Sequence, residues 1–332
     1  MLNLSTLLII AGTAVLLWAW RHSLPMSWTI RLFYIQLKGR YCAAAPAGGT
    51  KEKVTQSEPH LLLSHLPRPG SDIFEQVFTS SSFTATVDEC DFNFHLSNSS
   101  YPRAFDHARV ECGTRLFLRG YLDGSWIALG GTSFRFLQEI PLGAIYWIRI
   151  RILTWDDKWM YIQGEFITKP KKSKLIAPES DGDKYLVNCV ALAKTCIKSG
   201  RKTIPPWLFF AANGYAPSSS TKATANWTKA EDLRVKLLSE ARLKAKGKGN
   251  SDLAKDSFLA GRGYSKVAGL FTRYIPSTSA VSKSDSAVND SLNTFSQELE
   301  PWMDRKHWDV EGWETKRIQG FEMVRQLSLA AL

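Results

Sequence analysis

The stretch that decides the fold is residues 88–109, "DECDFNFHLSNSSYPRAFDHAR", where an acidic turn leads into a predicted helix. From Ser99 or Ser100 to Arg119, apolar side chains recur every three or four residues, which predicts one apolar stripe along an amphipathic helix. The stripe consists of Tyr101, Phe105, Ala108, Cys112 and Leu116. Pro102 fits the first turn, which tolerates a missing N–H, and Gly120 is the expected C-cap.

Extended segments follow this helix. They read "WIALGGTSFRFL" (126–137), "AIYWIRIRILTW" (144–155), "KWMYIQGEFIT" (158–168) and "KYLVNCVALAKTCI" (184–197), and "WDDK" reads as a hairpin turn between the second and third. Ile148, Ile150 and Ile152 alternate with Arg149 and Arg151, so the sheet should have one wet face. One long helix followed by antiparallel strands predicts an α+β domain whose sheet wraps the helix.

The N-terminal 20 residues contain no charged side chain. The apolar run of about 17 residues is short for a membrane span but matches a thin bilayer such as that of the endoplasmic reticulum. Basic residues follow it directly, which by the positive-inside rule keeps the rest in the cytosol. A signal peptide is the alternative, although it lacks a basic start and a cleavage site. The sequence therefore predicts a single-pass membrane protein with a transmembrane anchor at 1–21.

The remaining chain divides into three predicted parts. Residues 22–59 form a juxtamembrane amphipathic segment that lies on the membrane, followed by a Gly/Ala/Lys-rich linker. The folded domain spans 60–213. Residues 214–332 form a C-terminal extension with a basic helix, a Ser-rich linker that is predicted to be disordered, and a Trp-containing helix at the end. The basic helix begins at a capping box made by Thr228 and Glu231.

Composition limits the classes of partner. The formal charge is +11, but no zinc-finger spacing and no aromatic RNA-binding segment occurs, so nucleic acid is not an expected partner. The 5 cysteines are scattered and form no CxxC, which argues against a disulfide framework and a zinc site. No metal or cofactor ligand set is predicted.

The opening stretch also carries the candidate chemistry. A helix start presents free N–H groups and partial positive charge, which can hold a developing oxyanion. Asp91 lies eight residues before it and could act as a general base or nucleophile. His95 could orient a substrate, and Asn98 could donate to a thioester carbonyl. The plainer alternative is that these residues only form turns and caps.

The pattern D-x3-H-x2-N-x2-Y-x4-D-x2-R in this stretch resembles the signature of hotdog-fold thioesterases. The anchor and the "WDD" hairpin add a resemblance to the membrane-anchored thioesterase superfamily member 6-like proteins and their fungal relatives. The resemblance implies a hotdog fold, a homodimer with its active sites at the subunit interface, and Asp91 as base or nucleophile. It also implies that the substrate lies against Phe94, Ser99, Ser100 and Tyr101. Phe94 replaces a glycine found in many catalytic relatives.

The resemblance favours hydrolysis of an acyl thioester, carried by CoA or by a carrier protein, in fungal lipid or secondary-metabolite biosynthesis. Two alternatives stay open. "DFNFH" resembles the D-x-N-P-x-H core of hotdog enoyl hydratases, but its histidine is one residue too close and the proline is absent. The third possibility is a non-catalytic hotdog protein that binds acyl chains or acts as a scaffold.

Overall fold

The structure of the protein is a computed structural model. It describes residues 3–44, 67–169, 185–248, 269–275 and 300–329. The linker predicted before residue 60 and the Ser-rich linker predicted within 214–332 lie almost entirely outside these ranges. The expected helix and four long strands are present in the expected order.

A seven-stranded antiparallel sheet is the centre of the fold. Its strands are β1 (Val77–Thr79), β2 (Phe83–Thr84), β3 (Trp126–Phe136), β4 (Ile145–Trp155), β5 (Trp159–Thr168), β6 (Leu186–Ser199) and β7 (Lys202–Ile204). The order along the sheet is β1-β4-β5-β6-β3, with β2 paired to β4 and β7 paired to β6. The Asp156 carboxylate accepts the N–H groups of Lys158 and Trp159 at 2.8 and 2.6 Å, and this closes the predicted hairpin turn.

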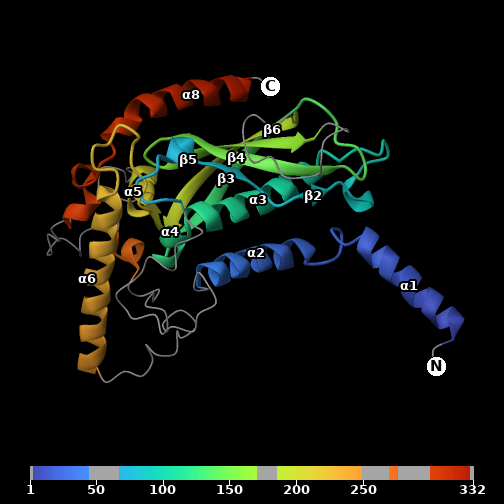
Figure 1. Ribbon diagram of the computed structural model, residues 1–332, viewed down its shortest axis with the longest axis horizontal. Coiled ribbons are helices and arrows are strands. Elements are labelled where there is room, and N and C mark those ends of the chain that lie inside the picture. Colours follow the sequence, from blue (N-terminus) through green and yellow to red (C-terminus); the bar gives the residue numbers. More distant parts are fainter. Residues whose placement is uncertain (1–2, 45–66, 170–184, 249–268, 276–299, 330–332) are drawn as a thin grey trace, which may run out of the picture.

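Helices cover both faces of the sheet (Figure 1). The helices of the described ranges are α1 (Leu4–Ala19), α2 (Ser27–Ala44), α3 (Ser100–Leu116), α4 (Leu118–Leu122), α5 (Pro206–Ala212), α6 (Ala225–Lys248) and α8 (Glu314–Leu329); of these, α3 and α8 lie on opposite faces of the sheet. Single 3₁₀ turns occur at Ile73–Glu75, Val87–Glu89, Leu270–Arg273, Pro301–Met303, Arg305–His307 and Glu311–Trp313.

Helix α3 is the helix that the sheet wraps. The predicted stripe is buried from Tyr101 to Cys112. Gly164 on β5 allows this close approach, because a Cβ there would overlap the Phe105 ring. The helix ends earlier than the pattern suggested: Phe117 takes the C-cap position, and Gly120 lies inside the short helix α4. One helix packed in a curved antiparallel sheet is the α+β arrangement that the pattern of elements predicted and the hotdog fold that the resemblance implied.

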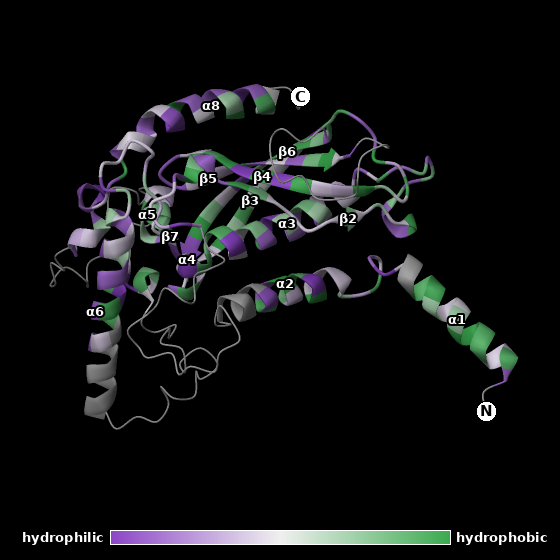
Figure 2. Ribbon diagram, in the orientation of Figure 1, coloured by the Kyte–Doolittle hydropathy of each residue, from purple (hydrophilic) through white to green (hydrophobic). Residues whose placement is uncertain are grey.

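The predicted transmembrane anchor is wrong. In the ranges described above, no helix combines the length and the apolar character needed to cross a bilayer. Helix α1 has 16 residues, which at 1.5 Å per residue gives roughly 24 Å against a hydrocarbon core of about 30 Å. It is apolar and stands away from the sheet (Figures 1 and 2). The single-pass localisation in the endoplasmic reticulum membrane, with the domain in the cytosol, is therefore not supported.

Helix α2 packs on α3, on the side of α3 that faces away from the sheet (Figure 1). Arg103 of α3 donates to the His22 carbonyl at 2.8 Å, and the Arg31 guanidinium lies 4.8 Å from the centre of the Phe83 ring. The Asp88 carboxylate accepts the N–H groups of His22 and Ser23 at 2.7 and 2.9 Å. The N-terminal segment is thus tied to the loop that leads into α3.

The far face of the sheet is not wet along its whole length, because α8 packs across β4 (Figure 1). Thr154 donates to the Arg317 carbonyl at 2.7 Å, and Arg317 donates to the Trp155 carbonyl at 3.1 Å. Arg149 keeps the polar character that the alternation predicted and pairs with Glu165 at 2.8 Å. The part of the predicted wet face that lies under α8 is therefore a buried helix–sheet contact.

Residues after 213 contribute to the same core as the sheet. Trp302, Trp308 and Trp313 are each at most 4% exposed. The Trp313 indole donates to the buried Asp72 carboxylate at 3.1 Å and its ring meets that of Trp155 edge to face. Helix α6 begins at Ala225, before the expected capping box, so Thr228 is inside the helix.

The substitution Gly320→Ala should weaken the packing of α8 on the sheet and lower the stability of the protein. Alanine in an exposed helix is more stable than glycine by about 1 kcal/mol. At this position, however, a Cβ would overlap the Leu153 carbonyl, which is backbone and has no room to move. We expect a net loss of about 1–3 kcal/mol in the free energy of unfolding, measured with urea. Gln319→Ala, on the exposed face of the same turn, is the control, and a stabilised Gly320→Ala would contradict the packing.

Candidate active site

The loop before α3 is a tight turn that holds Asp91 in place. Its ends pair through a bridge between Cys90 and Leu96, and the Asp91 N–H donates to the His95 carbonyl at 2.9 Å. The Asp91 carboxylate accepts the N–H of Asn93 at 2.9 Å, which leaves its second oxygen without a hydrogen bond in the described part of the chain. Phe94 forms the tip with φ of 59°, the left-handed conformation for which glycine is better suited.

Two neighbouring segments fix this loop. Leu96 N–H donates to the Ile140 carbonyl and Leu142 N–H donates to the Phe94 carbonyl, both at 2.8 Å. On the helix side, the Glu89 carbonyl accepts the Ser100 hydroxyl at 2.8 Å. The loop therefore has a defined position relative to the start of α3 and to the segment that follows β3.

A cavity of ≈ 320 Å³ opens between the loop, the start of α3 and the end of β3. It is lined by Asp91, Asn93, His95, Leu96, Asn98, Tyr101, Phe136, Leu137, Gln138 and Glu139. All three predicted catalytic residues and one predicted substrate-binding residue, Tyr101, are among them. Their common position follows from the tight loop, which folds Asp91 back towards the helix.

The other three predicted residues do not line this cavity. Phe94 is 67% exposed at the loop tip. Ser100 is buried and its hydroxyl donates to the Glu89 carbonyl. The Ser99 hydroxyl lies 2.9 Å from that of Ser97.

Glu139 is a site residue that sequence reasoning did not find. Its carboxylate lies 3.1 Å from Nε2 of His95, and the imidazole is about one third exposed. This contact favours one orientation of the ring, in which Nδ1 makes no hydrogen bond with the described residues. No sequence signal identifies it, because 44 residues separate the partners and the end of β3 brings them together.

The start of α3 supplies hydrogen-bond donors. Ser99 is the N-cap and makes no side-chain capping bond. Among the described residues, the backbone N–H groups of Ser99 and Tyr101 donate to no carbonyl, whereas the Ser100 N–H donates to the Ser97 carbonyl at 2.8 Å. Free N–H groups at a helix start stabilise negative charge, and the 17-residue helix adds its dipole.

The neighbouring thiol is not a candidate nucleophile. Burial, followed by the charges of Glu89 and Asp91, raises the pKa of Cys90 above its ordinary value. A thiol with a raised pKa stays protonated near neutral pH and is a poor nucleophile. Cys90 therefore does not compete with Asp91, His95 and Glu139, the titratable residues whose side chains can act in the cavity.

Comparison with known proteins identifies the domain. Residues 85–208 match the family described as the Thioesterase-like superfamily. The similarity to this hotdog-type family covers the loop, α3, α4 and the four long strands, and it ends three residues into α5.

Three relatives show how far the similarity extends. "Thioesterase poxG" of Penicillium oxalicum is 31% identical over 179 residues, covering 46% of this chain and 57% of that protein. "Probable thioesterase YBR096W" of Saccharomyces cerevisiae is 33% identical over 133 residues, covering 39% of this chain and 52% of that protein. "Protein THEM6" of Danio rerio is 34% identical over 83 residues, covering 24% of this chain and 41% of that protein. The chain spans about half the length of these relatives.

Proposed function

We propose that the protein hydrolyses an acyl thioester in the cavity at the start of α3. The observation that carries this proposal is that Asp91 and Tyr101, whose N–H at the start of α3 donates to no carbonyl of the described residues, line the same cavity. Hydrolysis of a thioester needs a base for water and donors for the oxyanion, and the cavity offers both. The names of two relatives, each called a thioesterase or probable thioesterase, support the same reaction class.

In the proposed reaction, water attacks the thioester carbonyl while Asp91 accepts a proton from it. The Tyr101 N–H and the Asn98 side chain at the helix start, which both line the cavity, hold the oxyanion that forms. Collapse of this intermediate breaks the C–S bond and releases the thiolate and the carboxylic acid. A thiol has a pKa of about 8.5, so the thiolate leaves without a strong general acid. Asn98 borders the acyl group and His95, held by Glu139, orients it.

The substrate is an acyl chain carried by CoA or by a carrier protein. The cavity wall supports an acyl group, since Phe136, Leu137 and Tyr101 provide apolar surface beside the polar loop. A role in fungal lipid or secondary-metabolite biosynthesis stays a prediction from the resemblance.

The direct test is release of free thiol from a panel of acyl-CoAs by the full chain. The full chain is needed because the N-terminal segment holds Asp88, three residues before Asp91. We expect turnover that depends on the acyl group. Binding of acyl-CoA without thiol release would instead favour the non-catalytic hotdog, and hydration of an enoyl thioester would favour the hydratase.

We also propose that the protein is a homodimer built on the edge strand β3. Within the described ranges, β3 pairs only with β6, so 11 residues of backbone are open on the other side. Trp126, Leu129 and Phe136 on this edge are 44–51% exposed. A long, apolar edge strand is a template for pairing, and two copies related by a twofold axis pair antiparallel.

Pairing of β3 would bring Phe136, and with it the cavity, to the subunit interface. Sedimentation at micromolar concentration should therefore show a dimer. A monomer would contradict both the pairing and an active site completed by a second copy.

A further inference from the structure

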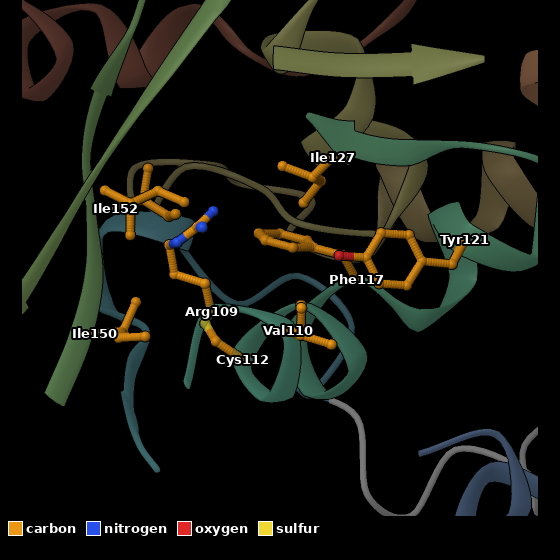
Figure 3. Close-up of a pocket in the computed structure, with 10 residues that line it drawn as sticks. Arg109, Val110, Cys112, Phe117, Tyr121, Ile127, Ile150 and Ile152 are labelled. Carbon is orange, nitrogen blue, oxygen red and sulfur yellow. The ribbon is translucent and has the colours of Figure 1, made fainter. Parts of the chain in front are cut away.

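A second cavity lies between the C-terminal half of α3, the short helix α4 and the sheet (Figure 3). Its volume is ≈ 50 Å³. The lining residues are Arg109, Val110, Cys112, Gly113, Phe117, Tyr121, Ile127, Ile150, Ile152 and Ile162. None of them lines the cavity that holds Asp91, so the two cavities are separate sites within one copy of the chain.

Arg109 is the one charged residue on these apolar walls. It rises from α3 between the isoleucines of β4 and the ring of Phe117 (Figure 3), and its side chain is 12% exposed. One terminal nitrogen pairs with Asp106 on the same helix. The Nε–H is buried and has no partner among the described residues. A buried donor without an acceptor is unfavourable, so this guanidinium is able to bind a further group.

Tyr121 supplies a second donor from the opposite wall. Its hydroxyl points into the cavity (Figure 3) and forms no hydrogen bond with the described residues. Gly113 leaves room for this hydroxyl, because a Cβ there would overlap it. Burial raises the pKa of Tyr121 well above its ordinary value, so the hydroxyl keeps its proton near neutral pH and can donate it.

We infer that this cavity binds a carboxylate carried on a short apolar group. The two donors face one volume, and among the described residues no Asp, Glu, Asn or Gln lines it. A carboxylate has two acceptor oxygens and a charge opposite to that of arginine. Its apolar stem would lie against Ile127, Ile150 and Phe117. The volume accommodates roughly four atoms of water size, which fits a carboxylate with one or two carbons.

The test uses ¹³C-labelled propionate and the full chain, with binding followed by NMR at constant ionic strength. Propionamide is the neutral probe of the same shape. We expect saturable binding of propionate and binding of propionamide that is weaker by about tenfold or more, because hydrogen bonds to a charged group are the stronger ones. Binding of both probes with equal affinity, or no saturation, overturns the inference.

Substitutions locate the site. Arg109→Gln should weaken propionate binding by about tenfold or more, and Tyr121→Phe by a smaller factor. Arg115→Gln, an exposed arginine on the same helix, should leave it unchanged. Unchanged binding in both cavity variants overturns the site. If Arg109→Gln does not fold, Tyr121→Phe and the propionamide comparison decide.

The carboxylate has two sources, a free acid or the far end of an acyl thioester, and hydrolysis rates distinguish them. The comparison of hydrolysis rates rests on the proposed thioesterase activity. Arg109 lies eight residues after Tyr101 on α3, roughly 12 Å along the helix, so the acyl chain of the test substrate has to be long. If Arg109→Gln slows hydrolysis of dodecanedioyl-CoA but not of dodecanoyl-CoA, the substrate carries the carboxylate. If it alters neither rate but abolishes propionate binding, a free acid is the ligand. Both results support the carboxylate site. If the protein shows no thioesterase activity, the measurement of propionate binding still tests this site.

Discussion

Asp91→Asn should lower thioester hydrolysis by about a hundredfold or more, the usual scale for loss of a general base or nucleophile. The carboxamide has the same shape and its oxygen can still accept the Asn93 N–H, so the turn is preserved. Because Asp91 is exposed, we expect the free energy of unfolding to change by no more than about 0.5 kcal/mol. Rates of thiol release and urea unfolding, measured on the same samples, test both statements.

The control for this substitution is Asp157→Asn, which removes an equally exposed carboxylate from the turn between β4 and β5. It should leave turnover unchanged. If Asp91→Asn also leaves turnover unchanged but lowers stability, Asp91 is a turn residue and the catalytic proposal fails.

His95→Ala separates the two enzymatic hypotheses. In the thioesterase mechanism His95 only orients the acyl group, so its loss should cost less than the loss of Asp91. In a hydratase, aspartate and histidine act together, and the two variants should be about equally damaging to hydration of an enoyl thioester. The contact of His95 with Glu139 suggests a further comparison, because Glu139→Gln should produce part of the His95→Ala effect if orientation is the role.

Local sequence patterns predicted most of the fold correctly. The spacing of apolar residues predicted α3, and the alternation in β4 and the turn before Trp159 predicted the hairpin, because periodicity and turn chemistry depend on nearby residues. Asp91, His95, Asn98 and Tyr101 could be grouped for the same reason, since they lie within eleven positions of one another.

The errors involve long-range contacts or lengths close to a limit. Helix α1 is apolar enough to suggest an anchor, but its 16 residues are too few to span a bilayer. The polar face of the sheet is covered by α8, which follows β4 by more than 150 residues. Glu139 reaches His95 only through the path of β3. No periodicity within a short segment contains this information.

Arg234→Met should be the most destabilising of these substitutions, with a loss of about 3–5 kcal/mol in the free energy of unfolding. Arg234 of α6 is 4% exposed and donates to the Asp123 carboxylate, to Glu231 and to the Ala212 carbonyl at 2.6–3.2 Å. Methionine keeps most of the length but removes every donor. Asp123, itself 2% exposed, would then be a buried charge without its main partner.

The size of this effect depends on α6 being part of the domain core. Lys236→Met, two residues along on the exposed face of α6, should change stability by less than about 0.5 kcal/mol. In the double variant Asp123→Asn/Arg234→Met the unpaired charge is gone, so the loss should be smaller than the sum of the two single losses, which is the mark of a coupled pair. If Arg234→Met were as mild as Lys236→Met, α6 would be an appendage that the hotdog domain folds without. A large and coupled loss would instead show that residues beyond 213 belong to the cooperative unit that also holds the active-site loop.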